Sequence, residues 1–491
     1  MGYLSGMLLA PFVSALLIML VPRRWPWVIR IIAALGSAVT LALSLAVFVG
    51  YDWRAGGFQF EERYPWIPEL GITVRLGVDG ISVPMVLLTG LVIFTGSVVS
   101  FKIADRPKEY YALLLVLVTG VFGVFVALDL FALFFAYEIA VLPMYLLIAI
   151  WGSTRKEYAA MKLTLMLVAG SVLVWVGMLA VFAQSGAATF DIEQLASPRF
   201  QALFSPEFQR VFFPIFFIGF GVLAGLWPFH TWSPDGHVAA PTAVSMLHAG
   251  VLMKLGAYGC IRVALWVLPE GARFWAPVFI VCGTIAAVYG AFSAMGQRDL
   301  KFVIGYSSVS HMGYVIVGIC TLSLVGLSGA VLQMFSHGIM TALFFALVGA
   351  VYDQAHTREI GIFEGLARTM PWFVGFFGVA GLASLGLPGL SGFVAELLIF
   401  LGAFQTYPIV GVLCVAAVAI TATYILRLMA KAFFGPFSPR WRGLHDMLPN
   451  EWVAGAILVA TLVIVGVYPT PFLNMINASV APLIDKVGGV K

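Results

Sequence analysis

Three ionisable residues lie inside otherwise apolar stretches of the chain: Glu138, Lys254 and Glu396. Ionisable side chains are costly at membrane depth, so those that occur there usually belong to ion or proton pathways. Desolvation disfavours the charged form of both carboxylates and amines, which brings their proton affinities closer together and suits them to exchange protons. The pattern predicts a proton relay. The alternative is a set of static ion pairs that hold helices together.

Four histidines in apolar surroundings add groups that titrate near neutral pH. They are His237, His248, His311 and His337. His248 precedes Lys254 by six residues, about 9 Å along a helix, so one water molecule or hydroxyl group would link the two side chains. No carboxylate or cysteine accompanies the histidines at helical spacing, so we expect no metal site. A single histidine in such a position is more often a hydrogen-bonded core residue than a member of a relay.

Lys162 is a further candidate for the relay, although it lies near the end of an apolar stretch. Arg262, Asp129 and Arg427 occupy similar positions. Long side chains at the ends of membrane spans usually extend to the interface, and we expect these residues to do so.

The elements that carry these residues must be membrane-spanning helices. Of the 491 residues, 61% are hydrophobic and only 10% are charged, which excludes a soluble globular protein. With about 20 residues per crossing, the length accommodates roughly fourteen crossings. Stretches such as 113–128 are apolar on every side, which excludes the alternating pattern of a membrane barrel. The sequence predicts an all-α polytopic membrane protein in one domain, residues 1–491.

The apolar stretches give the individual spans. We predict them near residues 3–21, 28–50, 81–102, 110–128, 130–151, 159–183, 211–227, 241–268, 273–294, 302–320, 324–351, 372–404 (interrupted), 408–431 and 452–472. The first span is long enough to cross the membrane and has no basic residue before it, so we expect a retained helix rather than a signal peptide.

Basic residues predict the orientation of the spans, because cytoplasmic loops carry an excess of Lys and Arg. Six odd-numbered loops carry such residues: Arg23 and Arg24; Lys102, Arg106 and Lys108; Arg155 and Lys156; Arg298 and Lys301; Arg358 and Arg368; Lys431, Arg440 and Arg442. The short even-numbered loops near Asp129, Thr321 and Gln405 carry none. Both termini should therefore face the outer side. The net charge of +4 is explained by this topology, and we expect no nucleic-acid partner.

Two interruptions break the hydrophobic pattern, at residues 226–237 and 385–392. Irregular backbone persists at membrane depth only where protein or a water-filled cavity satisfies its polar groups. The two breaks occupy corresponding places about five spans apart, as expected for duplicated transporter repeats with discontinuous helices. The alternative is that Pro228 and Pro388 only kink packed helices.

The chain shows no motif for a cofactor. Its four cysteines lie singly in apolar segments, so we expect neither an iron–sulfur cluster nor a haem. It has no Gly-rich dinucleotide or phosphate motif and no nucleophilic triad. We expect transport rather than covalent chemistry.

Six short motifs lie in and around the two breaks and the spans that follow them: Pro228-Phe-His-Thr-Trp, Pro234-Asp-Gly-His, Ala240-Pro-Thr-Ala, Leu255-Gly-Ala-Tyr-Gly, Tyr306-Ser-Ser-Val-Ser-His-Met-Gly and Leu387-Pro-Gly-Leu-Ser-Gly-Phe. With these motifs the chain resembles the antiporter-like subunits of respiratory complex I. Within that family the chain most resembles the M type, also called chain 4. The features that favour this type are Gly77-Val-Asp-Gly, the run around Glu138, and Glu396 where the sister types have lysine.

The resemblance implies fourteen helices, discontinuous helices 7 and 12, and two inverted five-helix repeats near 110–268 and 273–431, with a final helix at 452–472. It further implies a proton-translocating membrane-arm subunit of a bacterial NADH:quinone oxidoreductase in the cytoplasmic membrane, with Glu138, Lys254 and Glu396 in the relay. NADH, FMN, iron–sulfur clusters and quinone would be bound by partner subunits, with L-type and N-type subunits as neighbours.

One family residue is missing. The family's seventh-helix lysine, which pairs with the fifth-helix glutamate, corresponds to Leu223 here. The resemblance therefore predicts a Glu138 without its usual partner, and we consider His248 as a substitute.

Two other functions are compatible with the same motifs. One is a subunit of a multi-subunit cation/proton antiporter or a membrane-bound hydrogenase. The other is a structural paralogue that does not pump.

Overall fold

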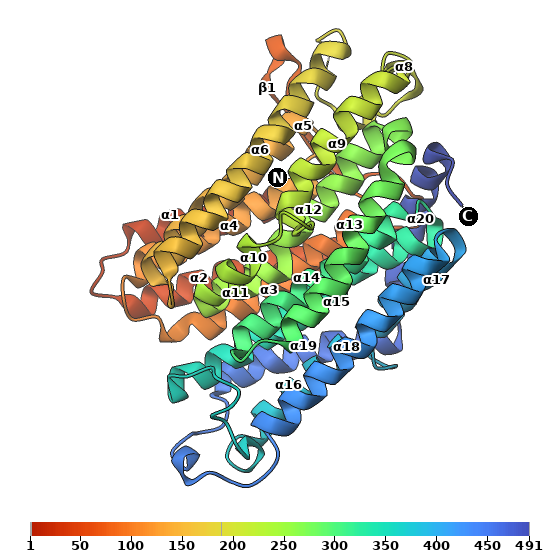
Figure 1. The fold of residues 1–491 in the computed structure, drawn as a ribbon. Helices are drawn as coiled ribbons and strands as arrows, with labels where there is room; N and C mark the ends of the chain where they lie inside the picture. The colour runs from red at the N-terminus through yellow and green to blue at the C-terminus, as the bar shows by residue number, and fades with distance from the viewer. Residues whose placement is uncertain (1, 188, 491) are drawn as a thin grey trace.

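The computed structural model describes residues 2–187 and 189–490. Within them, thirteen helical segments are long and apolar enough to cross a membrane, and each matches a predicted span. They are α1 Tyr3–Leu20, α2 Pro26–Gly50, α3 Ser82–Val99, α4 Pro107–Val126, α5 Leu130–Trp151, α6 Lys156–Gln184, α9 Pro206–Ala224, Thr242–Leu265, α13 Pro269–Met295, α14 Leu300–Cys320, α15 Leu324–Ala355, α18 Pro408–Ala432 and α19 Pro449–Val467. The prediction of a helical polytopic protein is confirmed (Figure 1).

A fourteenth crossing is built from two shorter helices, α16 Pro371–Ser384 and α17 Ser391–Thr406. In the break between them Gly386 and Gly389 have φ angles of 72° and 93°, a backbone region that residues with a Cβ atom rarely adopt. The seventh crossing is interrupted in the same way, since α9 is followed by a break and then by α10 Trp232–Ala239. The predicted discontinuity of helices 7 and 12 is confirmed.

The eighth crossing, Thr242–Leu265, is irregular throughout. It consists of α11 Thr242–Leu247, a π-helical segment His248–Leu252, α12 Met253–Gly259 and a second π-helical segment Cys260–Leu265. Such π segments are rare and concentrate at functional sites.

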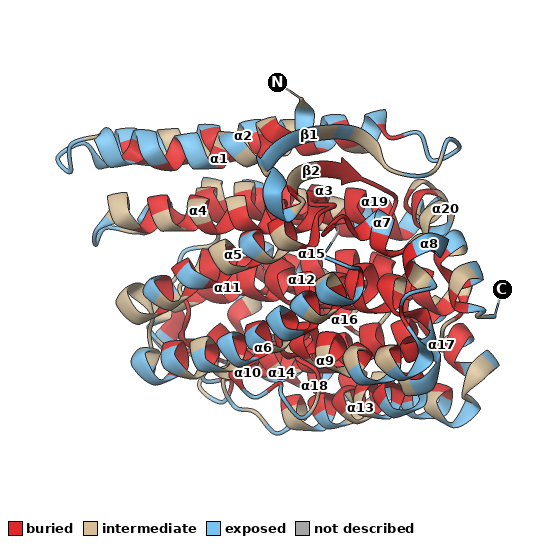
Figure 2. Ribbon diagram, turned by 90° about the horizontal axis from the view of Figure 1, so that it is seen from above, coloured by how far each residue is buried: buried red, intermediate tan, exposed pale blue. Residues whose placement is uncertain are grey.

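The centre of the bundle is formed by this eighth crossing and α15, whose most apolar 18-residue windows are wholly buried. Only a third of the corresponding windows of α1, α2 and α19 is buried. Figure 2 shows the resulting arrangement, with buried segments inside and exposed faces on the outer helices. A lysine on the eighth crossing is therefore surrounded by protein rather than by lipid.

The odd-numbered loops meet at one end of the bundle, here called the basic end. Ion pairs join them there: Arg23 with Glu109, Lys102 with Asp353 and Glu451, and Arg358 with Asp299. This clustering is what alternating membrane crossings predict.

The even-numbered loops meet at the opposite end, here called the hairpin end. They include an antiparallel hairpin, β1 Gln59–Ile67 and β2 Ile72–Val78, and the short helices α7 Ile192–Leu195 and α8 Pro198–Gln201. Arg75 on β2 pairs with Asp191 at 2.8 Å. A last helix, α20 Thr470–Val487, also lies here, because Lys486 donates to the carbonyls of Ala196 and Trp266. The hairpin and α20 were not predicted, since neither has the apolar pattern of a span.

Both ends of the described chain lie at the hairpin end. The Leu4 amide donates to the Glu62 carboxylate of β1 at 2.9 Å, and the Leu324 amide donates to the Val490 carbonyl at 3.0 Å. This agrees with the prediction that the two termini share one side.

One backbone motif occurs twice, once at each end. Asp129 caps α5 and forms an antiparallel bridge with Asp191 at the hairpin end, whereas Asp299 caps α14 and bridges Glu359 at the basic end. Because α5 and α14 are the second helices of the two predicted repeats, this duplication supports their inverted relation. The boundaries of the repeats remain a prediction.

Candidate functional site

Glu396 on α17 lies in a buried polar cluster with His311 of α14 and Gln333 of α15. The His311 Nδ1 atom lies 3.1 Å from the Glu396 Oε1 atom, and Gln333 Nε2 donates to the same oxygen at 3.2 Å. On its other side, His311 Nε2 lies 3.2 Å from the Ser384 hydroxyl at the end of α16. The break after Ser384 therefore places a hydroxyl group next to a titratable imidazole.

Lys254 on α12 lies in the middle of the bundle and is fully buried. Its Nζ atom is 2.7 Å from His337 Nδ1 on α15 and also donates to the Ala249 carbonyl within the first π-helical segment. The His337 ring lies 5.2 Å, centroid to centroid, from the His311 ring. Lys254, His337 and His311 thus form a series of neighbouring titratable groups that leads to Glu396.

His248 and His237 form a second pair, from the eighth and seventh crossings. Their Nδ1 atoms are 3.0 Å apart, so one ring donates and the other accepts. His237 Nε2 lies 3.1 Å from the Ser233 hydroxyl, and the His248 ring stacks on Trp232. The break before α10 brings Trp232, Ser233 and His237 to these positions.

We call the six residues Glu396, His311, His337, Lys254, His248 and His237 the central line. At most 2% of any of them is exposed. The structure therefore brings together six of the eight residues singled out from the sequence. Glu138 and Lys162 lie elsewhere.

Glu138 is half-buried on α5 and faces the Ser171 hydroxyl of α6. Its Oε1 atom is buried without a hydrogen-bond partner, and the carboxylate has no ion-pair partner within residues 2–187 and 189–490. Leu223 is fully buried, with its backbone packed against Gly256 of the eighth crossing. His248, considered as a substitute for the missing lysine, bonds to His237 instead.

Lys162 on α6 pairs with Asp235 of α10 at 2.7 Å, and both side chains are partly exposed. This pair fixes α10 against α6 at the side of the bundle. It is not a member of the central line.

The sequence interpretation was wrong for Arg262, which does not extend to the interface. Only 4% of its side chain is exposed, and Nη2 is 2.6 Å from the Asp79 carboxylate. The guanidinium lies over the rings of Phe58, Tyr258 and Trp266 at 5.1–5.3 Å. Asp129 is also buried, because its carboxylate accepts the amides of Phe131 and Ala132 as the cap of α5.

Arg262 extends the line of polar residues toward the hairpin end. Lys254, Tyr258 and Arg262 follow at four-residue spacing, and the Tyr258 hydroxyl accepts from Arg262 Nε at 3.2 Å. A cavity of about 140 Å³ adjoins Arg262 and Asp79 and is also lined by Glu193.

Lys301 continues the series of buried polar residues toward the basic end. It was missed as a candidate, because it lies at the start of a span and was assigned to the loop before it. It is 4% exposed, and its Nζ atom donates to the Ala240 carbonyl at 2.7 Å and to the Ser245 hydroxyl at 3.2 Å. Ser245 in turn donates to the backbone carbonyl of His237. Together these residues place polar groups from one end of the bundle to the other.

Comparison with known proteins places the chain among membrane subunits of one family. The family described as NADH:quinone oxidoreductase/Mrp antiporter, TM, matches residues 127–421. The chain is 38% identical over 477 residues to NAD(P)H-quinone oxidoreductase chain 4 2 of Thermosynechococcus vestitus, covering 95% of this chain and 89% of that protein. It is 38% identical to the chain 4 1 protein of Synechococcus sp. (strain JA-3-3Ab), covering 95% and 90%.

Solved structures share the fold. A chain of respiratory complex I from Thermus thermophilus with bound NADH superposes with a TM-score of 0.91 at 27% identity, covering 99% of this chain and all of that chain. A chain of the Mrp complex from Dietzia sp. DQ12-45-1b has the same fold, with a TM-score of 0.84 at 20% identity and full coverage of both chains.

Proposed function

Because the chain belongs to the NADH:quinone oxidoreductase/Mrp antiporter family, we propose that it is the chain 4-type, proton-translocating subunit of a membrane-bound NADH:quinone oxidoreductase. The observation that carries the proposal is the central line inside a membrane bundle: the neighbouring buried groups Lys254, His337, His311 and Glu396, with the buried pair His237 and His248 on the seventh and eighth crossings. We propose that the chain has no redox centre, and that NADH, FMN, iron–sulfur clusters and quinone are bound by partner subunits.

A proton is exchanged between Lys254 and His337 at their contact. At 2.7 Å the two nitrogens share one proton, carried by the ammonium and donated to the neutral imidazole. Transfer leaves a neutral amine and an imidazolium. Because like charges disfavour each other, a proton that arrives on one group promotes release from its neighbour.

The rest of the line carries the proton in two directions. From His337 it passes to the neighbouring ring of His311, 5.2 Å away between centroids, and then to Glu396 over the 3.1 Å contact. From Lys254 the polar groups Tyr258, Arg262 and Asp79 lead to the hairpin end. The break glycines at 386 and 389 leave room for the backbone to turn next to Glu396.

Glu138 lies beside an exposed face of α5 that a neighbouring subunit would cover. It shares one face of α5 with Phe135 and Leu142, which are 48% and 72% exposed. A carboxylate on such a face would be covered by another membrane subunit, and we propose the L-type and N-type subunits as neighbours. A cation on the neighbour would replace the partner that Leu223 cannot supply.

The orientation follows from the charge distribution. We propose that the basic end faces the cytoplasm and that both termini face the outer side of a bacterial cytoplasmic membrane. The ion-paired loops at the basic end support this proposal.

The proposal is tested with the whole purified complex in vesicles, by measuring proton uptake per NADH oxidised with quinone as acceptor. We expect Lys254→Ala to abolish the contribution of this subunit and Glu138→Gln to reduce it. Lys162→Gln, which lies outside the central line, is the matched control and should keep the wild-type ratio.

An unchanged ratio in both Lys254→Ala and Glu138→Gln would overturn the proposal. It would favour the second candidate, a structural subunit that does not pump. The specific observations for that candidate are a Glu138 without an ion-pair partner in the described parts of the chain and Leu223 where the family has a lysine.

A further inference from the structure

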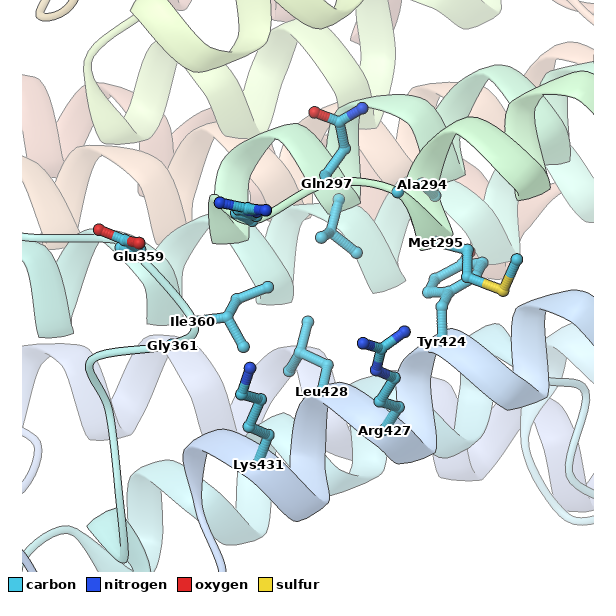
Figure 3. A pocket seen from close by; sticks show the side chains of 13 residues that line it. Ala294, Met295, Gln297, Glu359, Ile360, Gly361, Tyr424, Arg427, Leu428 and Lys431 are labelled. Carbon is cyan, nitrogen blue, oxygen red and sulfur yellow. The ribbon is translucent and has the colours of Figure 1, made fainter.

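A cavity of about 440 Å³ opens at the basic end and belongs to no part of the relay. It lies between the loop after α13, the segment 359–361 and the last turns of α18. Figure 3 shows that Arg427 and Lys431 both extend from α18 into this space, with Glu359 on its opposite side. The volume is in the range of small-molecule and headgroup sites.

The lining carries an excess of positive charge. Arg298, Arg427 and Lys431 face one carboxylate, that of Glu359, and none of the three cations has an ion-pair partner in the described parts of the chain. Other cations at this end are neutralised, for example Lys102 by Glu451 and Arg358 by Asp299. Arg427 and Lys431 are four residues apart on one helix, an arrangement that is destabilising for like charges unless an anion lies between them.

The inverted repeats offer an internal comparison. The last span of the first predicted repeat carries Arg262 near its end, and the last span of the second carries Arg427. Each arginine lines a cavity at the end of its span. The cavity of Arg262 lies next to the loop that pairs with Asp129 at the start of α5, and the cavity of Arg427 lies next to the loop that pairs with Asp299 at the start of α14. Asp79, which precedes the first repeat, supplies the counter-ion of Arg262 at 2.6 Å. Within the described parts of the chain, no acidic side chain forms an ion pair with Arg427.

We propose that this cavity binds the phosphate of an anionic glycerophospholipid. The forked guanidinium groups of Arg298 and Arg427 match phosphate oxygens, and the ammonium of Lys431 adds a point charge. The surface beside the cavity suits acyl chains, because Phe292 of α13 and Leu426 of α18 are 53% and 52% exposed. Basic pockets between the ends of membrane helices commonly hold such headgroups. A soluble anion would leave the adjoining apolar surface uncovered.

The test uses the whole detergent-solubilised complex and a photoactivatable phosphatidylglycerol. We expect labelling in peptides that contain residues 294–303 and 424–431, competed by phosphatidylglycerol but not by phosphatidylcholine or inorganic phosphate. The Arg427→Gln/Lys431→Gln variant should lower the labelling by about twenty-five-fold, since each basic residue near an anionic lipid contributes about a fivefold factor.

Two further variants keep the test falsifiable. Arg440→Gln/Arg442→Gln removes the same charge from the same end but outside the cavity, and should label as wild type. Glu359→Gln removes the carboxylate that lines the cavity opposite the basic residues and should increase labelling. Competition by inorganic phosphate would instead identify a soluble-anion site. The proposal would also be overturned if the Arg427→Gln/Lys431→Gln variant were labelled as strongly as the wild type, or if the Arg440→Gln/Arg442→Gln control lost as much labelling as that variant.

Discussion

The Asp79–Arg262 ion pair permits a quantitative prediction. Both side chains are almost completely buried, and the oxygen and nitrogen are 2.6 Å apart. Removing one partner of a buried pair costs about 3–5 kcal/mol, because the other charge is left uncompensated. The two partners differ, however, in what else they contact.

Asp79→Asn leaves the arginine with only the Tyr258 hydroxyl and three aromatic faces, so we expect a loss of about 4 kcal/mol in local stability. Arg262→Met leaves Asp79 with donors from Ile81 N, Ser82 N and Ser82 Oγ, at 3.0–3.1 Å. These bonds to a charged acceptor offset part of the penalty, and we expect about 2 kcal/mol. The double variant buries no unpaired charge and should be more stable than Asp79→Asn alone.

Cys260 reports on this region, because it is fully buried and lies two residues before Arg262. The assay is native-state labelling of Cys260 by a thiol reagent in the whole complex, with Cys282, Cys320 and Cys414 replaced by alanine. Labelling through local opening accelerates tenfold per about 1.4 kcal/mol. We therefore expect a roughly thousandfold acceleration in Asp79→Asn and a roughly thirtyfold one in Arg262→Met.

The control is Glu270→Gln, which removes an exposed ion pair with Arg273 and should change the rate less than about fivefold. The reasoning is refuted if the accelerations of the two single variants multiply in the double variant, since that would mean that the two charges do not interact. It is also refuted if Asp79→Asn labels no faster than the control.

Three other predictions concern the relay and its frame. Leu223→Lys should leave the proton uptake per NADH unchanged, because Leu223 packs against Gly256 and the proposed cation for Glu138 comes from a neighbouring subunit; an increased ratio would show that the added ammonium pairs with Glu138 instead. Gly386→Ala should lower the proton uptake per NADH and reduce the stability of the protein by about 1 kcal/mol or more, because φ is 72° and the new Cβ would lie 3.0 Å from Glu396 Oε2. Gly375→Ala is the control, because a Cβ at that position meets nothing within 4 Å. Burial raises the pKa of Asp129 to about 6, so the folded state favours the protonated form and should gain stability as the pH falls from about 7 to about 5. Thermal unfolding should show this gain in the wild type and a smaller one in Asp129→Asn, and equal pH profiles would contradict it.

The sequence was most informative where a residue contradicted its surroundings. Lys254, Glu396 and the histidines stand out because ionisable groups are rare in apolar runs, and the fold indeed places all but Glu138 and Lys162 in one line. Gln333 was missed because an amide inside an apolar helix carries no charge, although it bonds to both His311 and Glu396.

The pairing of distant segments could not be predicted from local pattern. Asp79 lies in a loop and Arg262 at a span end, and only the packing of the hairpin end on the eighth crossing buries them together. The hairpin itself has a mixed charged and aromatic sequence whose pairing depends on contacts at that end, for example Arg75 with Asp191. Glu138 has no ion-pair partner within residues 2–187 and 189–490, and a cation on a neighbouring subunit, as proposed, would lie outside this sequence.

The π-helical segments decide where the central bundle tolerates a change of length. Each residue added to or removed from an α-helix rotates everything beyond it by about 100°, whereas a π turn holds about one residue more than an α turn. Deleting one residue between His248 and Leu252 would therefore let this segment become α-helical, with Lys254 still facing His337 and Arg262 still facing Asp79. Deleting one residue between Gln333 and His337 in the regular helix α15 would instead rotate these two side chains apart, so that they could no longer contact Glu396 and Lys254 together.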